Sequence, residues 1–523
     1  MDNDTPVGEI KKAALRPSVV KHFSIEGLFG YRSISLDSKY AATVLIAKNG
    51  SGKTTLLGAL DAFLRGQFTR LANLDFQSIS CAIDGIPEVM QISKAQIDEL
   101  VAMSNEPQFA SQAKLWEQEP QALLELLEMD FDRMTNSEAM DNPLFSAIYT
   151  KLSYDVGEAK SRCKRLVEPI RARTPHLNRI RSLLRAALSE FEIVYLPTYR
   201  RIELSIPSVE SRTGRRKKSI LARLGVSQRG LHTGDINFGL SDISDRLGAL
   251  YRDILFQSNQ GYGKVSANII NDLVTGAFDQ SVPALNARPS KEALQIFFER
   301  IKDMDREYRY GPYNSVKIPD IDAIYNDDVP PDSKKFLNYF LGQLNSVIQK
   351  TQDIESTVEQ FINNCNKYLS GDDASTATKR SANVASSDDK VLTFNKRNLR
   401  VTVTSRRGKR KVPLDALSSG EKQMISLFAQ LYLYPKKKIV LIDEPELSLS
   451  LDWQRKILPD ILSSLTCEQV IAITHSPFIF DNELEPFAAS LRLSFSPTSA
   501  EDLFPELAMD ESIDNLEDNV DDH

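Results

Sequence analysis

The sequence predicts an α/β fold that is interrupted by a long, mostly helical insertion. The first observation is a glycine-rich loop, residues 47–55 (AKNGSGKTT), between an apolar strand and an apolar helix. The second is an apolar strand near the other end of the chain, residues 438–446 (KIVLIDEPE), which ends in carboxylates. The third is the spacing, because a serine–glycine motif at 417–423 (LSSGEKQ) follows the loop only after some 365 positions.

The composition is that of a globular protein with several domains. The chain has 523 residues, of which 41% are hydrophobic and 26% charged, and such a length accommodates roughly two to four domains. No apolar run approaches the roughly 18 residues of a membrane helix, and the first twenty residues lack a signal-peptide pattern. We therefore expect a cytoplasmic protein with no membrane partner.

Cysteine and histidine usage argues against a zinc site, a disulfide framework and an HNH-type nuclease centre. The four cysteines stand singly, with no CxxC pair, so neither a zinc site nor a disulfide framework is predicted. The five histidines are not clustered, whereas nucleases of the HNH type need clustered histidines. We therefore expect no nuclease centre of this type in the chain.

Residues 1–89 are expected to form the N-terminal half of the α/β domain. Alternating and β-branched residues predict strands at 19–25, 31–36, 43–46 and 76–83. Helical spacing of apolar residues predicts a helix at 54–64, directly after the glycine-rich loop.

Residues 90–370 are expected to form a helical insertion lobe. Its helical segments are predicted to be about ten to twenty residues long, because prolines recur along it and each one removes a helix donor. This pattern argues against a long coiled-coil arm. One apolar strand, 192–197, is expected to return to the α/β domain (the head) as a central strand and to carry Arg200 and Arg201 to the edge of a site.

The last part of the chain is expected to contain a linker, the second half of the head and a tail. Residues 371–390 are rich in Ser, Ala, Asp and Thr, which is typical of a flexible linker. Residues 391–485 contain a predicted hairpin and the two remaining motifs. Residues 486–523 are expected to be a partly disordered acidic tail, because ten acidic and no basic residues occur from Glu501 onward.

The glycine-rich loop has the residues of a Walker A motif. The backbone N–H groups of such a loop bind phosphate oxygens at the positive end of a helix. Lys53 would neutralise the β and γ phosphates of ATP, and the Thr54 hydroxyl would ligate Mg²⁺. Ala47 replaces the usual first glycine, which is tolerable at negative φ. The predicted nucleotide-binding residues are Asn49, Gly50, Ser51, Gly52, Lys53, Thr54 and Thr55.

The carboxylates at the end of strand 438–443 have the spacing of a Walker B motif. Asp443 would hold Mg²⁺ through water, and Glu444 would polarise the attacking water as the general base. His475 ends the apolar strand 470–474 and would reach a γ-phosphate. Gln77 is either a Mg²⁺-facing glutamine or an ordinary exposed strand residue. The predicted catalytic residues are Glu444, His475 and Lys53, and the predicted metal-site residues are Thr54, Asp443 and Gln77.

The serine–glycine motif is expected to open a helix and so to form a second anion site. In ABC-type ATPases this helix reaches the nucleotide that the other subunit binds, so the motif predicts a head-to-tail dimer. The predicted signature residues are Ser418, Ser419, Gly420 and Glu421.

Together these motifs resemble those of ABC-type ATPases of the overcoming-lysogenisation (OLD-like) and RecF-like group. Within that group the sequence is similar to the PtuA-like ATPase subunits of Septu-type and retron-associated anti-phage systems. The resemblance is carried by AKNGSGKTT, YLPTYRRIE, LSSGEKQ, LIDEPELSL and ITHSP, and covers about residues 20–85, 190–205 and 390–480. Ser450 stands where the family often has a histidine, which leaves the coupling between paired sites open.

The resemblance implies an ABC-type P-loop ATPase head that uses ATP and Mg²⁺. It implies a homodimer or higher oligomer that controls an HNH-type nuclease subunit in an anti-phage defence complex. In retron-type relatives, a reverse transcriptase and its DNA product would join the assembly. The alternative is a DNA-repair ATPase of the RecF or SMC type without a nuclease partner. A self-contained OLD-type nuclease is not expected, because only 48 residues follow His475.

Several basic residues are candidates for contact with nucleic acid or a partner. Solvated helix faces and loops often have the same composition, and for Arg200 and Arg201 a structural salt bridge is the equal alternative. Aromatic residues are not interleaved with the charges, which argues against stacking on single-stranded bases. The candidates are Lys160, Arg162, Lys164, Arg165, Arg200, Arg201, Arg215, Arg216, Lys217 and Lys218.

Overall fold

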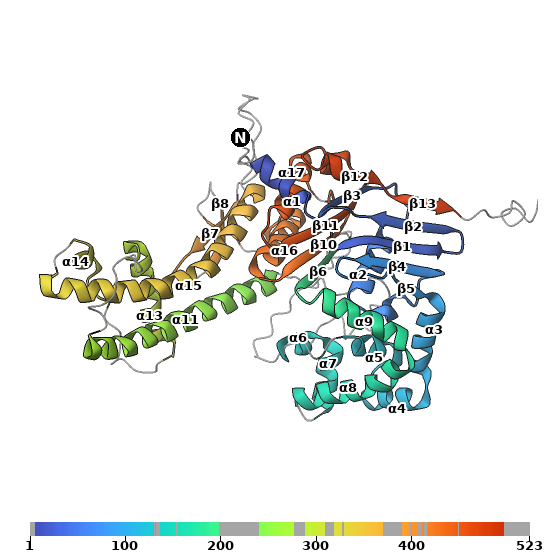
Figure 1. Ribbon diagram of the computed structural model, residues 1–523, viewed down its shortest axis with the longest axis horizontal. Coiled ribbons are helices and arrows are strands. Elements are labelled where there is room, and N and C mark those ends of the chain that lie inside the picture. The colour runs from blue at the N-terminus through green and yellow to red at the C-terminus, as the bar shows by residue number, and fades with distance from the viewer. Residues whose placement is uncertain are drawn as a thin grey trace, which may run out of the picture. The chain divides into compact units, whose positions relative to one another are not determined.

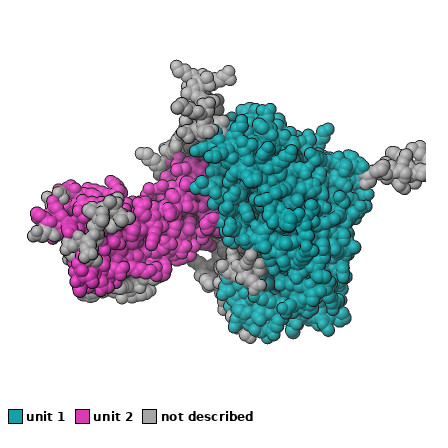
Figure 2. Space-filling model, viewed as in Figure 1, with its two compact units in different colours: residues 1–236, 436–523 teal, residues 237–435 magenta. Residues whose placement is uncertain are grey.

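The computed structural model divides the chain into two compact units. Residues 1–236 and 436–523 form unit 1, and residues 237–435 form unit 2 (Figure 2). The structure describes residues 6–129, 131, 136–152, 155–197, 240–276, 288–308, 318–326, 329–369, 390–397, 400–405, 410–412, 416–447 and 449–495. The division differs from the expected ranges, because residues 90–236 cluster with the head and the signature motif clusters with the second unit.

A parallel sheet lies at the centre of unit 1 (Figure 1). Its order is β12-β3-β11-β10-β6, and every described neighbour pair is parallel. The strands are β3 (Ala42–Ile46), β6 (Phe191–Leu196), β10 (Lys437–Asp443), β11 (Cys467–Thr474) and β12 (Ala488–Ser490). β10 and β11 are buried almost throughout, as expected of central strands covered on both faces. The expectation that strand 192–197 is central is wrong, because β6 is the last strand in this order.

A second, antiparallel sheet covers the first. Its order is β13-β2-β1-β4-β5. The strands are β1 (Val20–Leu28), β2 (Arg32–Asp37), β4 (Ser78–Ile83), β5 (Met90–Ser93) and β13 (Arg492–Phe495). β5 pairs with β4 beyond the expected boundary at residue 89. β12 and β13 extend the head into the expected tail, whose residues 496–523 lie outside the described residues.

Helix α2 (Lys53–Leu64) packs between the two sheets and fixes the glycine-rich loop. Ten of its twelve residues are buried, and it contacts β1, β6 and β10. Phe63 meets Phe23 of β1 edge to face, with ring centroids 6.0 Å apart. Each fully buried Leu or Phe contributes about 1.5–3 kcal/mol. A helix that is apolar on every side belongs in a core, so the loop before α2 has a rigid support.

Short helices complete unit 1. They are α1 (Pro6–Ala14), α3 (Lys94–Ala102), α4 (Pro107–Leu115), α5 (Pro120–Leu127), α6 (Asn136–Asp141), α7 (Pro143–Lys151), α8 (Val156–Arg173), α9 (Pro175–Ala187) and α17 (Leu451–Leu462). Five of them, α1, α4, α5, α7 and α9, carry proline in the first turn. Proline is favourable there because its missing N–H would have no helical partner. The prolines thus begin these helices. Within residues 90–197 only α8 and α9, with 18 and 13 residues, have the predicted length of ten to twenty residues, whereas α3 to α7 have only six to nine.

A buried ion pair joins helices α5 and α9 to the far end of α2. The Arg181 guanidinium pairs with Glu128 and donates to the Gly66 carbonyl at 3.0 Å. Glu128 also accepts from the Thr69 backbone N–H at 3.0 Å. Burial raises the pKa of the Glu128 carboxyl, while the Arg181 charge opposes that rise. Because both side chains are almost fully buried, removing one would leave the other uncompensated.

Unit 2 is built on two long helices, α11 (Leu240–Thr275) and α15 (Pro331–Leu369), which lie side by side (Figure 1). Gly261 faces Val347, and the Tyr339 hydroxyl donates to Asp272 at 2.8 Å. The partner of the later α11 residue is the earlier α15 residue, so the helices are antiparallel. α11 has 36 residues and α15 has 39, which corresponds to about 54 Å or more at 1.5 Å per residue.

The expected limit of ten to twenty residues is therefore wrong for these two helices. The prolines of this part of the chain lie between the helices or at the first position of α15, so they interrupt neither. Unit 2 also contains α13 (Lys291–Tyr308), α14 (Ile321–Tyr325), α16 (Ser419–Leu433) and an antiparallel sheet of β7 (Lys390–Asn395), β8 (Arg400–Ser405) and β9 (Lys411–Val412). Across the described part of the chain, no helix has the length and apolarity needed to cross a membrane.

Candidate nucleotide-binding site

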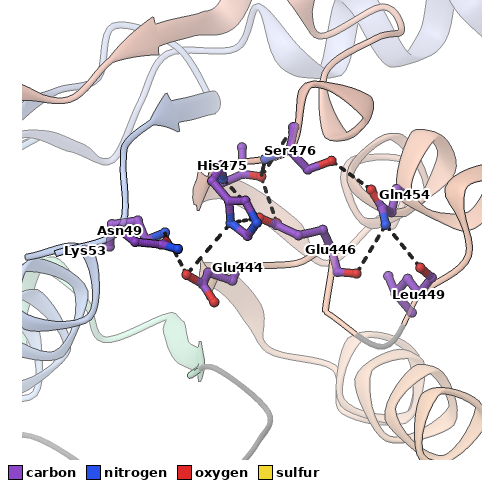
Figure 3. A network of polar contacts seen from close by, with 9 residues as sticks. Asn49, Lys53, Glu444, Glu446, Leu449, Gln454, His475 and Ser476 are labelled. Carbon is purple, nitrogen blue, oxygen red and sulfur yellow. Dashed lines mark hydrogen bonds and ion pairs between the residues drawn. The ribbon is translucent and has the colours of Figure 1, made fainter. Parts of the chain in front are cut away.

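The predicted catalytic residues of unit 1 meet at one edge of the parallel sheet (Figure 3). β3, β11 and β10 are neighbours, and parallel strands end at the same edge. The glycine-rich loop follows β3, His475 follows β11, and Glu444 follows β10. Backbone hydrogen bonds tie the three ends together, since Ala47 N–H donates to Thr474 O at 3.0 Å and Glu444 N–H donates to Ile473 O at 2.8 Å.

The loop needs glycine at two positions, Gly50 and Gly52, and at Gly52 for two reasons. Gly50 and Gly52 have φ values of +79° and +92°, a region that residues with a side chain rarely adopt. A Cβ on Gly52 would also lie 2.6 Å from Cδ1 of Ile34, whereas a Cβ on Gly50 would meet nothing within 4 Å. Ala47 keeps a negative φ and is buried, so its methyl group is tolerated as expected.

Arg32, from strand β2, also contacts the loop. Its Nη1 donates to the Gly50 carbonyl at 3.1 Å, and its guanidinium lies 5.2 Å from the ring centre of Phe29. This contact of Arg32 is not predictable from the sequence, because nothing in the local pattern of β2 indicates that the strand passes the loop.

Lys53, the first residue of α2, is held by two partners. Its Nζ lies 2.6 Å from Oε1 of Glu444 and donates to Oδ1 of Asn49 at 3.1 Å. Lys53 is 5% exposed and the Glu444 side chain 16%, so water screens this ion pair only weakly. Charge-assisted hydrogen bonds of this length are among the strong ones.

Glu444 has an unusual backbone. Its φ is +53°, a left-handed conformation that costs a residue with a side chain about 1–3 kcal/mol. The surrounding structure compensates this cost, because the Glu444 N–H is bonded to β11 and the carboxylate to Lys53. The strained turn directs the carboxylate toward the glycine-rich loop.

Thr54 and Asp443 form an oxygen pair suited to Mg²⁺. The Thr54 hydroxyl donates to Oδ2 of Asp443, which is almost fully buried. Hydroxyl and carboxylate oxygens are the ligands that Mg²⁺ prefers, with several waters completing its shell. The contact between these two side chains therefore fits the ion.

Gln77 lies at the start of β4 and is exposed. A Cβ on Gly27 would lie 2.4 Å from Cγ of Gln77, so the Gln77 side chain packs against the backbone of β1. The hydrogen bond that joins Thr54 and Asp443 does not include it. Its role toward Mg²⁺ stays a prediction.

His475 is held by a second glutamate, Glu446. Nδ1 of His475 lies 2.7 Å from Oε1 of Glu446 and 3.9 Å from Oε1 of Glu444. The ring is 44% exposed and the Glu446 side chain 5%. This role of Glu446 is not predictable from the sequence, since only the folded arrangement of β10 and β11 brings Glu446 into contact with His475.

The signature residues begin helix α16 in unit 2. Ser418 caps the helix with its hydroxyl, which accepts from the Glu421 N–H at 3.3 Å, and Oε2 of Glu421 accepts from the Ser418 N–H at 2.7 Å. Lys390 pairs with Glu421 at 2.9 Å. This reciprocal cap explains why Ser and Glu stand three positions apart. Contact of this helix with a second subunit's nucleotide stays a prediction.

The candidate basic residues of α8 already have interaction partners. Arg162 and Arg165 both pair with Glu158, at 2.7 and 3.3 Å, and Lys160 and Lys164 have interaction partners too. Such exposed pairs contribute only about 0–1 kcal/mol, so a phosphate could replace them. The other candidates lie outside the described residues: Arg200, Arg201, Arg215, Arg216, Lys217 and Lys218.

Comparison with solved structures gives a match of low similarity. The structure is titled "Crystal structure of the SmcHead bound to the C-winged helix domain of ScpA", with 17% identity and a TM-score of 0.19. The match covers 32% of this chain and 48% of that one, so this chain spans about half of its length. A search of curated protein sequences finds no match.

Comparison with family models gives a match over most of the chain. The model described as "AAA domain, putative AbiEii toxin, Type IV TA system" matches residues 42–481. This range includes the glycine-rich loop, the acidic strand end and His475, the elements that form the site described above. The chain therefore belongs to this family of P-loop ATPase domains.

Proposed function

We propose that the chain binds and hydrolyses ATP in the presence of Mg²⁺ at the edge of the parallel sheet. The observation that carries the proposal is the convergence of a lysine, a hydroxyl–carboxylate pair, a second carboxylate and a histidine on one phosphate-binding loop. ATP hydrolysis needs these groups, because its catalysis is almost entirely positioning and charge stabilisation.

The ion pair between Lys53 and Glu444 suggests the order of events. The β and γ phosphates of ATP would attract the Lys53 ammonium, and Glu444 would then lose its cationic partner. The released carboxylate can accept a proton from water while that water attacks the γ-phosphorus. The bond between the γ-phosphorus and the bridging oxygen breaks, and ADP and phosphate leave. His475 would contact the γ-phosphate.

Thr54 and Asp443 would hold Mg²⁺, Thr54 directly and Asp443 through water. The ion, when bound, neutralises charge on the β and γ phosphates. Asn49 keeps the Lys53 side chain close to the loop.

We further propose that two copies share their sites head to tail. The support is the capped N-terminus of α16, whose first turn offers backbone N–H groups to an anion. A mixture of two inactive variants tests this. Lys53→Ala removes one half of a site and Ser418→Arg the other. In an equal mixture, half of the dimers would be mixed and each would keep one complete site, so about a quarter of the activity should return. No recovery would contradict shared sites.

We place this ATPase in the cytoplasm, as the regulatory subunit of an anti-phage defence complex. The family description names a putative toxin of a Type IV TA system, and the sequence motifs resemble those of PtuA-like subunits. The effector would be a separate HNH-type nuclease, joined in retron-type systems by a reverse transcriptase and its DNA. Affinity purification of the tagged chain with the products of its neighbouring genes tests this, and a nuclease that never copurifies would argue against it.

A second candidate is a DNA-repair ATPase without a nuclease partner. The observation that favours it is the pair of long antiparallel helices in unit 2, with 36 and 39 residues. The two functions predict different behaviour of the purified chain. A repair ATPase should hydrolyse ATP faster when duplex DNA is added, whereas a regulatory subunit should respond to its nuclease.

A further inference from the structure

Glu446 makes three contacts around His475 and has almost no access to solvent. Its Oε1 accepts from the His475 backbone N–H at 3.0 Å and lies 2.7 Å from Nδ1 of the same residue. Its Oε2 accepts from the Thr474 hydroxyl at 2.7 Å. Figure 3 shows the carboxylate beside the imidazole ring, away from Lys53.

We infer that Glu446 is the positioning residue that fixes the orientation and tautomer of His475. An ionised carboxylate can only accept hydrogen bonds, so Nδ1 must carry a proton. In the neutral ring the proton is then absent from Nε2, which is the nitrogen left to face a nucleotide. Carboxylate–histidine pairs of this kind set the tautomer and orientation of functional histidines in other settings. The inference rests on the proposed ATP hydrolysis for its kinetic consequence only.

A buried amide extends the same network to the segment after Glu446. Nε2 of Gln454 donates to the Leu449 carbonyl at 3.1 Å, and Oε1 accepts from the Ser476 hydroxyl at 2.8 Å. The Ser476 N–H in turn donates to the Thr474 hydroxyl at 3.0 Å. Contacts made by the segment around Leu449 can therefore reach His475 through a chain of four residues, which are Gln454, Ser476, Thr474 and Glu446.

The simpler interpretation is that Glu446 only ties the ends of β10 and β11 together. A tether of this kind would affect folding stability but not the tautomer or the orientation of the His475 ring. The two interpretations differ in the protonation of Nε2 and in kcat, and both quantities can be measured.

The spectroscopic test uses chain labelled with ¹⁵N-histidine, at about pH 8.5, where an ordinary imidazole is neutral. Long-range ¹H–¹⁵N spectra report which ring nitrogen is protonated, and the His475→Gln variant identifies the His475 signals. We expect the Nδ1–H form in the wild-type chain and a shift toward the Nε2–H form in Glu446→Ala. An Nε2–H wild-type ring would overturn the inference. This readout does not need ATP, so it remains valid if the chain proves not to be an ATPase.

The kinetic test compares Glu446→Ala and the near-isosteric Glu446→Gln with Glu485→Gln, a change at an exposed glutamate outside the site. Loss of an outer partner of a functional histidine typically costs about 10–100-fold. We expect kcat to fall by that factor in Glu446→Ala and by less in Glu446→Gln, which keeps an acceptor oxygen. KM for ATP should stay within about twofold, because the contacts of Glu446 are with Thr474 and His475 and not with the glycine-rich loop that would bind most of the nucleotide.

If Glu446→Ala does not fold, the Gln variant decides the question. A Gln variant with normal kcat and the Nδ1–H form contradicts the need for the charged carboxylate. Normal ATP hydrolysis with an Nε2–H ring would reject the positioning role while leaving the proposed function intact. A wild-type chain that does not hydrolyse ATP but has an Nδ1–H ring would reject the proposed function while leaving the positioning role intact.

Discussion

Replacing Glu444 by Gln should strengthen ATP binding while it slows hydrolysis. Lys53 and Glu444 form a weakly screened ion pair with a separation of 2.6 Å. ATP must draw the ammonium away from that carboxylate before Lys53 can bind phosphate, so the ion pair opposes nucleotide binding. Gln keeps the side-chain length and the same backbone turn but not the negative charge.

The size of the effect follows from the kind of contact that is weakened. With Gln the Lys53 ammonium keeps a hydrogen bond but loses its ionic partner, so we expect the contact to weaken by part of the range of about 1.5–3 kcal/mol that hydrogen bonds to charged groups contribute. A weakening of about 1–2 kcal/mol corresponds to roughly 5–30-fold tighter binding. The weaker repulsion between residue 444 and the γ-phosphate acts in the same direction.

Isothermal titration calorimetry with Mg²⁺ and a non-hydrolysable ATP analogue measures this change. Adenosine serves as the control ligand, because it has no phosphate to attract Lys53. Glu485→Gln serves as the control variant, because it removes an exposed carboxylate outside the site. Equal or weaker binding of the ATP analogue by Glu444→Gln would refute the reasoning. So would an equal gain in the affinity for adenosine.

Three further predictions concern the loop, the long helices and the cysteines. Gly52→Ala should abolish ATP binding and lower the melting temperature, because it adds a 2.6 Å clash to backbone strain, whereas Gly50→Ala adds about 1 kcal/mol of strain alone. Gly261→Ala should destabilise unit 2, since its Cβ would lie 2.4 Å from Val347, while Gly263→Ala, with nothing within 4 Å, should stabilise it by about 1 kcal/mol in denaturant titrations. Burial raises the pKa of the Cys467 thiol from 9.0 to about 12. The stabilisation that comes from keeping this buried thiol uncharged is therefore fully present below pH 9 and is lost as the pH rises from 9 through 12. Because the thiol is buried, a thiol reagent at neutral pH should label Cys467 only after unfolding.

The residues whose roles depend on neighbouring positions in the chain were predictable from the sequence. Gly52, Lys53 and Thr54 depend on one strand, one turn and one helix, and all three are encoded within a few neighbouring positions. Glu444 and His475 follow apolar strands, and parallel strands end at one edge, so their proximity could be expected too. The structure places each of these residues at that edge of the sheet.

The residues that depend on tertiary neighbours were not predictable. Glu446 and Gln454 act through contacts with the end of another strand, which the sequence does not reveal. The length of α11 and α15 was missed for a different reason. Prolines are frequent across residues 90–370, but their spacing leaves two stretches of 36 and 39 residues without an internal break. Proline frequency alone is thus a poor guide to helix length when the positions are uneven.

A single-turnover assay of ATP hydrolysis by the purified chain tests the assignment of this site most directly, because the assay needs no partner. The wild-type chain with Mg²⁺ should convert bound ATP to ADP and phosphate, and chelation of Mg²⁺ should stop it. Glu444→Gln should bind ATP at least as tightly and hydrolyse it about 10²–10⁴-fold more slowly, the usual loss for a general base. A wild-type chain that binds no ATP, or a Glu444→Gln variant that hydrolyses at the wild-type rate, would contradict the assignment of this site.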